Sequence, residues 1–361
     1  MVFIFGACRN GYKIKKFIEI KSGEKADYYI DNNKKKQGLD LDGIKVISFE
    51  HVLEIIRNEK GIHKILVALL NPEVVIDQIR DSGIIADVFV LTRKFFANFE
   101  QCNLIPDILC KIDYSLHRLD YLEVHVAHHC NLKCKGCGHM SNKIPPQFPD
   151  FEQYRKDLAR LKTFFWGVKR FRLMGGEPLL NPQLPEYIRE TRRTFPDANI
   201  RVVSNGLLIP TVNDEIFYAM KEECVGFDIS CYHPTAKIRG NIELRCVENE
   251  IPYDFSEEID YFFERYLEEG PKDPYIAYNV CESKTCHLML EGKISLCPSP
   301  VLRSKFKKYT GRKTFEEDII DLYDKKITSD KLYELMTHPN RQCAYCSAET
   351  EFFEWEGYCE E

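Results

Sequence analysis

The chain has 361 residues, 44% of them hydrophobic and 29% charged, which allows two or three globular domains and gives no sign of disorder. A net charge of −6 gives no reason to expect a nucleic acid partner, because phosphate binding needs concentrated positive charge. The sequence has no apolar run of membrane-spanning length and no signal-like opening, so we expect a cytoplasmic protein without a membrane partner. In that compartment, 15 cysteines indicate metal ligands rather than disulfides.

The first part of the chain alternates short strands and helices. Val2–Phe5 runs into a turn, Gly6–Gly11, and the next strand ends before Asp31, where a ribose-binding carboxylate would lie. This layout predicts a parallel sheet over residues 1–95, which resembles the Rossmann-like domain of some carbohydrate-pathway proteins. Cys8 stands where a glycine usually lets the backbone approach a pyrophosphate, so the domain either binds a nucleotide or serves only structure or substrate docking.

Residues 96–120 lose this periodicity and are predicted to connect two domains, with Cys102 and Cys110 as buried small side chains. From residue 121 to about residue 280, strands and amphipathic helices alternate again, which predicts a partial β/α barrel. In such folds the functional residues gather at the carboxyl ends of the strands. The motifs at those ends are therefore the candidates for chemistry.

Three cysteines follow the first strand of this region: Cys130, Cys134 and Cys137, at the spacing C-x3-C-x2-C. Thiolates on so short a loop converge on one metal centre, either zinc with a fourth ligand or a [4Fe-4S] cluster with one open iron. The loop resembles the signature of the radical S-adenosylmethionine (SAM) superfamily. Two later strand ends strengthen the resemblance, because Gly175–Pro178 is similar to the GGEP element of the family and Val202–Gly206 to its next functional strand end.

The resemblance implies a fold, cofactors and residue roles. It implies a (β/α)6 radical SAM core over residues 121–280, in which the three cysteines hold a [4Fe-4S] cluster and SAM binds the open iron. Reduction by a donor such as flavodoxin or ferredoxin would cleave SAM to a 5′-deoxyadenosyl radical that abstracts a substrate hydrogen. The residues implied to contact SAM are Gly175, Gly176, Glu177, Ser204, Asn205 and Ser230. A tight glycine turn and helix caps would give the same residues without a ligand.

Position 136 departs from the family pattern. The residue before the third cysteine is often aromatic in this superfamily and touches the adenine of SAM, whereas here it is Gly136. Another residue must therefore pack against adenine, and the sequence does not name it.

The C-terminal region, residues 281–361, is predicted to be a small cysteine-rich α+β region. Its candidate metal ligands are Cys286, Cys297, Cys343 and Cys346, with Cys281 and Cys359 in reserve. The pattern C-x5-G-x4-C and the later C-x2-C pair resemble the twitch extension, a shortened relative of the SPASM domain, which implies a second [4Fe-4S] cluster. The alternative is a zinc ribbon, which also needs four thiolate ligands.

A cluster with four thiolate ligands has no open iron, so its expected role is electron transfer. This favours a reaction in which the substrate radical gives up an electron. The resemblance to twitch proteins, together with the Rossmann-like front domain, implies an enzyme that oxidises or epimerises a sugar-like or nucleotide-linked small molecule. Cys231 could donate a hydrogen atom and His233 could act as a base, although ordinary packing would also explain either residue. The alternatives are radical SAM modification of a peptide or protein, and a non-catalytic iron-sulfur or zinc protein that binds a partner.

Overall fold

The computed structural model describes residues 1–266, 271–311 and 313–357. The chain divides into two compact units, Met1–Arg118 with Pro196–Ala198, and Leu119–Phe195 with Asn199–Glu361. No helix within the described ranges is both long enough and apolar enough to cross a lipid bilayer. The predicted domain boundaries at residues 95, 120 and 280 stay predictions.

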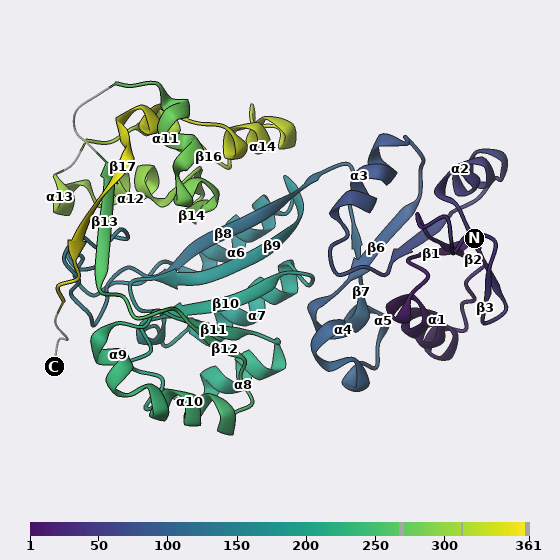
Figure 1. Cartoon of the computed structure of the whole chain (residues 1–361), viewed down its shortest axis with the longest axis horizontal. Coiled ribbons are helices and arrows are strands. Elements are labelled where there is room, and N and C mark those ends of the chain that lie inside the picture. The colour runs from purple at the N-terminus through teal and green to yellow at the C-terminus, as the bar shows by residue number, and fades with distance from the viewer. Residues whose placement is uncertain (267–270, 312, 358–361) are drawn as a thin grey trace. The chain divides into compact units, whose positions relative to one another are not determined.

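The first unit is built on one sheet of seven strands (Figure 1). These are β1 (Val2–Phe5), β2 (Tyr28–Ile30), β3 (Asp40–Leu41), β4 (Ile44–Ile47), β5 (Lys64–Val67), β6 (Asp87–Leu91) and β7 (Leu109–Ile112). Their order is β3-β4-β2-β1-β5-β6-β7, with the inner strands parallel and the two edge strands antiparallel to their neighbours. This confirms the predicted Rossmann-like parallel sheet.

Helices cover both faces of this sheet. They are α1 (Arg9–Ser22), α2 (Phe49–Asn58), α3 (Glu73–Asp81), α4 (Arg93–Asn98) and α5 (Ile105–Ile108), with the 3-10 turn η1 (Phe99–Gln101). Ile4 of β1 packs in one hydrophobic core with Ile14 and Ile18 of α1. Successive strand side chains point to opposite faces, so Phe5 faces the other way, and its ring centre lies 5.8 Å from that of Phe49 in α2.

The second unit contains a sheet of eight strands. These are β8 (His117–Ala127), β9 (Phe165–Gly175), β10 (Asn199–Ser204), β11 (Gly226–Ile229), β12 (Tyr253–Phe255), β14 (Leu288–Leu290), β15 (Lys293–Ser295) and β16 (Ile320–Asp321). Over the described residues the order β12-β11-β10-β9-β8-β14-β15-β16 is open, which confirms a partial rather than a closed barrel. The strands β9 to β12 run parallel. On the other side, β14 joins β8 in parallel, so strands of the C-terminal region extend the sheet of the core.

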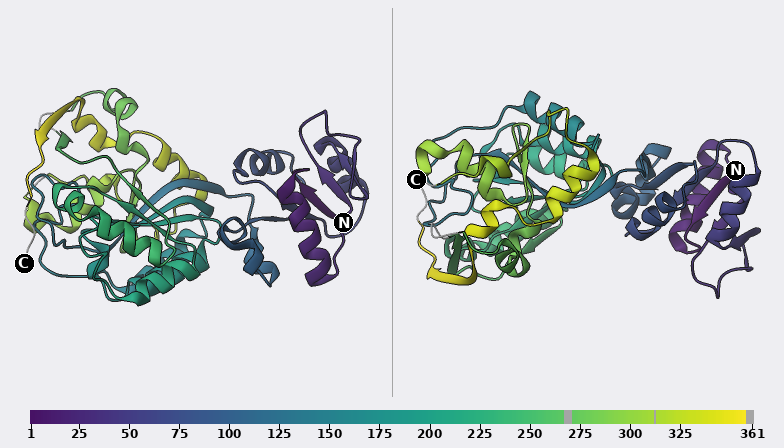
Figure 2. Two further views of the ribbon diagram at one scale, coloured as in Figure 1. Left: turned by 60° about the horizontal axis from the view of Figure 1, so that its bottom comes forward. Right: turned by 90° about the horizontal axis from the view of Figure 1, so that it is seen from above.

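Helices cover one face of the strands β9 to β12 (Figure 2). Along β10 and the second half of β9, buried side chains alternate with partly exposed ones, as expected for strands with one covered face. The helices and turn of this part are α6 (Phe151–Leu161), α7 (Leu184–Thr194), α8 (Asp214–Glu222), α9 (His233–Lys237), α10 (Arg239–Glu248) and η2 (Pro178–Leu180). Phe171 of β9 packs against Phe195 at the end of α7, with ring centres 5.9 Å apart. On the opposite face, Arg172 forms an ion pair with Asp228 at 2.7 Å.

The remaining elements surround the C-terminal cysteines. They are α11 (Pro274–Val280), α12 (Pro298–Lys305), α13 (Lys307–Thr310), α14 (Ser329–Thr337) and the 3-10 turns η3 (Glu282–Thr285), η4 (Glu316–Asp318) and η5 (Arg341–Tyr345). An antiparallel ribbon joins β13 (Tyr261–Tyr266) to β17 (Cys346–Glu354). Just beyond β17, the carbonyl oxygen of Glu356 accepts a hydrogen bond from the N–H of Lys135 at 2.8 Å. The ribbon therefore reaches the loop that carries the first three cysteines.

Candidate metal centre

Cys130, Cys134 and Cys137 lie on the loop that follows β8. The Cys130 sulfur accepts hydrogen bonds from the N–H of Leu132 at 3.3 Å and from the side-chain amide of Asn205 at 3.5 Å. Burial raises the pKa of Cys130 to about 12. A thiolate at this position therefore needs a cation in place of the proton, which is the exchange that accompanies metal binding.

Backbone N–H groups surround the third thiol. Burial raises the pKa of Cys137, and hydrogen bonds from the backbone of residues 139–142 oppose that rise because they stabilise the thiolate. Donors aimed at a sulfur in this way suit a thiolate that keeps negative charge while it binds a metal. The donor set, three thiols of which two face N–H groups, fits a [4Fe-4S] cluster.

Gly175 and Gly176 end β9 against the cysteine loop. A Cβ atom on Gly175 would lie 2.1 Å from the carbonyl oxygen of Ala127, and one on Gly176 would lie 1.8 Å from the carbonyl oxygen of His129. The N–H of Gly176 donates to Ala127 at 2.9 Å. Glycine is required here by the close approach of two backbones. Contact between these glycines and SAM stays a prediction.

Glu177 is completely buried and holds neighbouring strand ends together. Its carboxylate accepts hydrogen bonds from the Ser204 hydroxyl at 2.8 Å, the Asn205 N–H at 2.9 Å and the Leu179 N–H at 3.1 Å. Burial raises the pKa of Glu177 to about 7, against the effect of these donors. The N–H of Ser230 donates to the carbonyl oxygen of Ser204 at 2.9 Å. The structure thus brings the predicted SAM contacts of three strand ends together, with the Glu177 carboxylate as their internal support.

Four thiols of the C-terminal region line one small cavity: Cys281, Cys297, Cys343 and Cys346. Burial raises the pKa of Cys297 well above its usual value, and negative charge on the other three thiols raises it further. Thiols that oppose each other's ionisation gain most from a shared cation. The set therefore suits a metal ion or a cluster with four thiolate ligands.

This grouping differs from the predicted ligand set at one position. The lining of that cavity does not include Cys286, which follows η3 and whose thiol donates a hydrogen bond to the buried carboxylate of Glu123 in β8. Burial, and then negative charge on Glu123, raise the pKa of Cys286 to about 12. We propose Cys281 as the ligand in its place. The sequence allows either cysteine, because Cys281 forms the longer pattern C-x10-G-x4-C through Gly292. The other reserve ligand, Cys359, lies outside the described residues.

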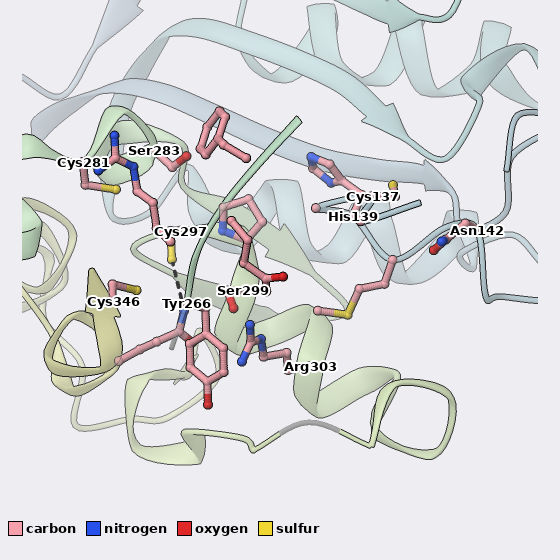
Figure 3. A pocket seen from close by; sticks show the side chains of 18 of the residues that line it. Cys137, His139, Asn142, Tyr266, Cys281, Ser283, Cys297, Ser299, Arg303 and Cys346 are labelled. Atoms are coloured by element: carbon pink, nitrogen blue, oxygen red, sulfur yellow. Dashed lines mark hydrogen bonds between the residues drawn. The ribbon is translucent and has the colours of Figure 1, made fainter. Parts of the chain in front are cut away.

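A larger cavity of about 330 Å³ borders both groups of thiols (Figure 3). Cys137 and His139 from the loop after β8 form one part of its lining. Cys281, Cys297 and Cys346 form another part. A small molecule in this cavity would therefore lie close to both candidate metal centres.

The charged side chains in the lining of this cavity are mainly basic. Among the described residues they are Lys143, Arg265 and Arg303, with Glu264 as the one acid. Arg303 is only 3% exposed, and its guanidinium carbon lies 3.4 Å from the centre of the Tyr266 ring. Stacking on an aromatic face is a common environment for a guanidinium group. Sequence reasoning missed these residues because they come from separate segments with no shared motif.

Cys231 and His233, the predicted hydrogen donor and base, lie elsewhere. The lining of the 330 Å³ cavity includes neither residue. Cys231 is 3% exposed, and its N–H donates to the Ser256 hydroxyl at 2.9 Å. His233 is exposed, with Nδ1 2.6 Å from Glu258 and Nε2 3.7 Å from Asp260. Their catalytic roles stay predictions.

In the first unit, the carboxylate expected to meet a ribose is already engaged. Asp31 accepts a hydrogen bond from the N–H of Ala7 at 3.1 Å and forms an ion pair with Lys36 at 2.8 Å. Lys36 also donates to the carbonyl oxygen of Ala7 at 3.0 Å. Asp31 and Lys36 thus bond to each other and to Ala7 in the turn after β1. A nucleotide would have to replace these contacts to bind there. Nucleotide binding at this turn stays a prediction.

The Radical SAM superfamily model matches residues 124–251. The chain contains a radical SAM domain. The match spans the cysteine loop, the glycine turn after β9 and the polar end of β10, which confirms the resemblance that these motifs carry. Radical SAM domains use a [4Fe-4S] cluster and SAM, so both are cofactors of this domain.

Relatives of the radical SAM domain include two GTP 3',8-cyclases. The chain is 27% identical to that of Microcystis aeruginosa over 107 residues, which are 29% of this chain and 32% of the relative. It is 32% identical to that of Chlorobaculum tepidum over 101 residues, which are 28% of this chain and 30% of the relative. The chain thus spans about a third of the length of the curated relatives it matches. Among solved structures, BtrN in complex with AdoMet and 2-DOIA is 17% identical, with a TM-score of 0.39 over 63% of this chain and 92% of that chain.

Proposed function

We propose that this protein is a radical SAM oxidoreductase that converts an alcohol of a sugar-like, nucleotide-linked small molecule to a carbonyl group. One observation carries the proposal. The 330 Å³ cavity is lined by Cys137 of the radical SAM loop and also by Cys281, Cys297 and Cys346. A substrate in it would be within reach of a hydrogen-abstracting centre and of an electron-accepting centre together.

The oxidation removes one hydrogen atom from carbon, one proton from the hydroxyl group and one electron. When bound, the first cluster with SAM supplies the 5′-deoxyadenosyl radical for the hydrogen atom, and a second cluster on the four C-terminal thiols supplies an electron acceptor. Glu264 is the only carboxylate among the described residues of the lining and is our candidate for accepting the hydroxyl proton.

The charge of the lining supports a substrate that carries phosphate. Lys143, Arg265 and Arg303 outnumber Glu264, and positive charge in a concave site attracts and orients anions. Arginine in particular matches the paired oxygens of a phosphate. A nucleotide-linked sugar combines such phosphates with oxidisable alcohols.

Oxidation is favoured over epimerisation. Epimerisation needs a hydrogen-atom donor such as a thiol on the far side of the substrate. The predicted donor, Cys231, is not part of the cavity lining, whereas the candidate electron acceptor is. Non-catalytic binding would leave the shared border of the two thiol groups without a use.

The test is turnover of anaerobically reconstituted enzyme with a panel of nucleotide-linked sugars. We expect equal amounts of 5′-deoxyadenosine and of the oxidised product, which has two hydrogen atoms fewer than the substrate. Mass spectrometry measures both. Glu264→Gln should slow formation of the carbonyl product, whereas Glu257→Gln, a change at an exposed carboxylate, should not. A product of unchanged mass with an inverted centre would establish epimerisation instead. Loaded enzyme that cleaves no SAM with any sugar or peptide would refute catalysis on these substrates.

A further inference from the structure

The residue before Cys137 has no side chain, and an aromatic ring from a distant segment lies against it. Gly136 has a φ of +73°, and a Cβ atom built on it would lie 2.4 Å from Cζ and 2.9 Å from Cε2 of Phe353. The Phe353 ring therefore occupies the space in which a side chain at position 136 would begin. Among the described residues, the three atoms nearest to that Cβ position all belong to the Phe353 ring.

The β13–β17 ribbon holds Phe353 at this position. Phe353 is paired in register with Phe262, and the two rings meet edge to face with centres 6.3 Å apart. Beyond the strand, Glu356 anchors the segment to Lys135 by a backbone hydrogen bond and by an ion pair, each 2.8 Å long. The ring is thus fixed from two sides next to the cysteine loop.

Further aromatic rings extend this surface. Tyr232, which follows β11, stacks on Trp355 with ring centres 5.3 Å apart and an angle of 26° between the planes. Tyr232 also meets Phe262 edge to face at 6.1 Å. Aromatic side chains stack on purines because every base offers a π-face, and each such contact is worth a measurable part of the affinity. SAM contains a purine, and with its aminoacyl end on a cluster held by Cys130, Cys134 and Cys137 it would lie at the loop that these rings flank.

We propose that Phe353 provides the aromatic surface against which the adenine of SAM packs, so that the C-terminal ribbon completes the SAM site. This inference rests on the proposed function in that SAM binds at the Cys130–Cys137 loop. It assigns the adenine contact that Gly136 cannot make to a residue far along the chain. Phe353 is a binding residue and takes no part in bond breaking.

The neighbouring residue offers a matched control. Phe352 lies on the opposite side of β17, is 66% exposed, and packs against Phe263 with ring centres 6.1 Å apart. Phe352→Ala removes the same ring from the same strand without touching Gly136. Phe353→Leu is the second variant, because it keeps an apolar side chain on Gly136 and removes only the aromatic face.

The experiment is equilibrium dialysis of SAM against anaerobically reconstituted full-length protein, with iron content matched between variants. We expect Phe353→Ala to raise the dissociation constant for SAM about tenfold, as loss of one base-stacking contact does, and Phe352→Ala to leave it within about twofold of the wild type. Phe353→Leu should retain its iron and still bind SAM several-fold more weakly.

The outcomes distinguish failure of the adenine contact from failure of the proposed function. If the wild type binds SAM and both Phe353 variants bind it as well as Phe352→Ala does, the inference is overturned and the proposed function stands. If Phe353→Ala loses its iron, Phe353→Leu decides: unchanged SAM affinity in that variant would make Phe353 a cover for the loop only. A loaded wild type that binds no SAM would refute the proposed function itself.

Discussion

Replacing Cys281 should lower the iron content of the C-terminal region, whereas replacing Cys286 should leave it unchanged. Cys281 lines one cavity with Cys297, Cys343 and Cys346, whereas Cys286 donates its hydrogen bond to Glu123. The test is clearest in a chain in which Cys130, Cys134 and Cys137 are already alanine. One remaining cluster with four thiolate ligands then corresponds to about four irons per chain.

In that background, Cys281→Ala leaves three thiols around the cavity and should lower the iron content well below four. Cys286→Ala leaves all four and should keep about four irons. Iron and sulfide analysis with Mössbauer spectra on anaerobically purified protein measures both. Retention of the cluster in Cys281→Ala together with its loss in Cys286→Ala would refute the revised ligand set. About one zinc and no iron in both the background and Cys286→Ala would make the site structural and remove the electron acceptor from the proposed function.

Three further predictions concern stability, each measured by unfolding of the purified protein. Burial raises the pKa of Glu123 from 4.5 to about 7, so the folded state keeps the proton to a higher pH than the unfolded state does. The free energy of unfolding should therefore fall by up to roughly 3 kcal/mol as the pH rises from 4.5 to 7. Glu123→Gln should reduce that pH dependence. Gly136→Ala should cost about 1–2 kcal/mol from its positive φ, plus the clash with Phe353, and adding Phe353→Ala should recover the clash but not the φ cost. Asp31→Ala should cost about 1–3 kcal/mol, because the N–H of Ala7 loses its acceptor, and SAM affinity should not change.

The parts of the fold that follow from local pattern could be predicted from the sequence. The apolar strands that alternate with amphipathic helices gave the parallel sheet around β1 and the partial barrel from β8 to β12. The position of β14 beside β8 could not be predicted, because a three-residue strand carries too little periodicity to identify its partner. Pairing between distant segments is decided by packing, which spacing along the chain does not encode.

The residues of the candidate site also differ in how far the sequence alone predicts them. Cys130, Cys134 and Cys137 lie on one short loop, so their spacing reveals them directly. Cys281 and Cys286 both precede Gly292 by plausible distances, and only the fold places one in the cavity and the other at Glu123. The contact between Phe353 and Gly136 was harder still to predict from the sequence. Phe353 belongs to no motif, and it reaches Gly136 through a ribbon whose two strands are far apart in sequence.

The contact between the ribbon and the cysteine loop has a consequence for the order of biosynthesis. Lys135 and Glu356 are 221 positions apart, so at about 5–20 residues per second the loop is translated roughly 10 to 40 seconds before the segment that covers it. During that interval the three thiols lie open, with neither Phe353 nor Glu356 in place. Iron and sulfide delivered to the nascent chain at this stage would reach the loop before the ribbon exists, whereas in the completed fold Phe353 and Glu356 already lie against it.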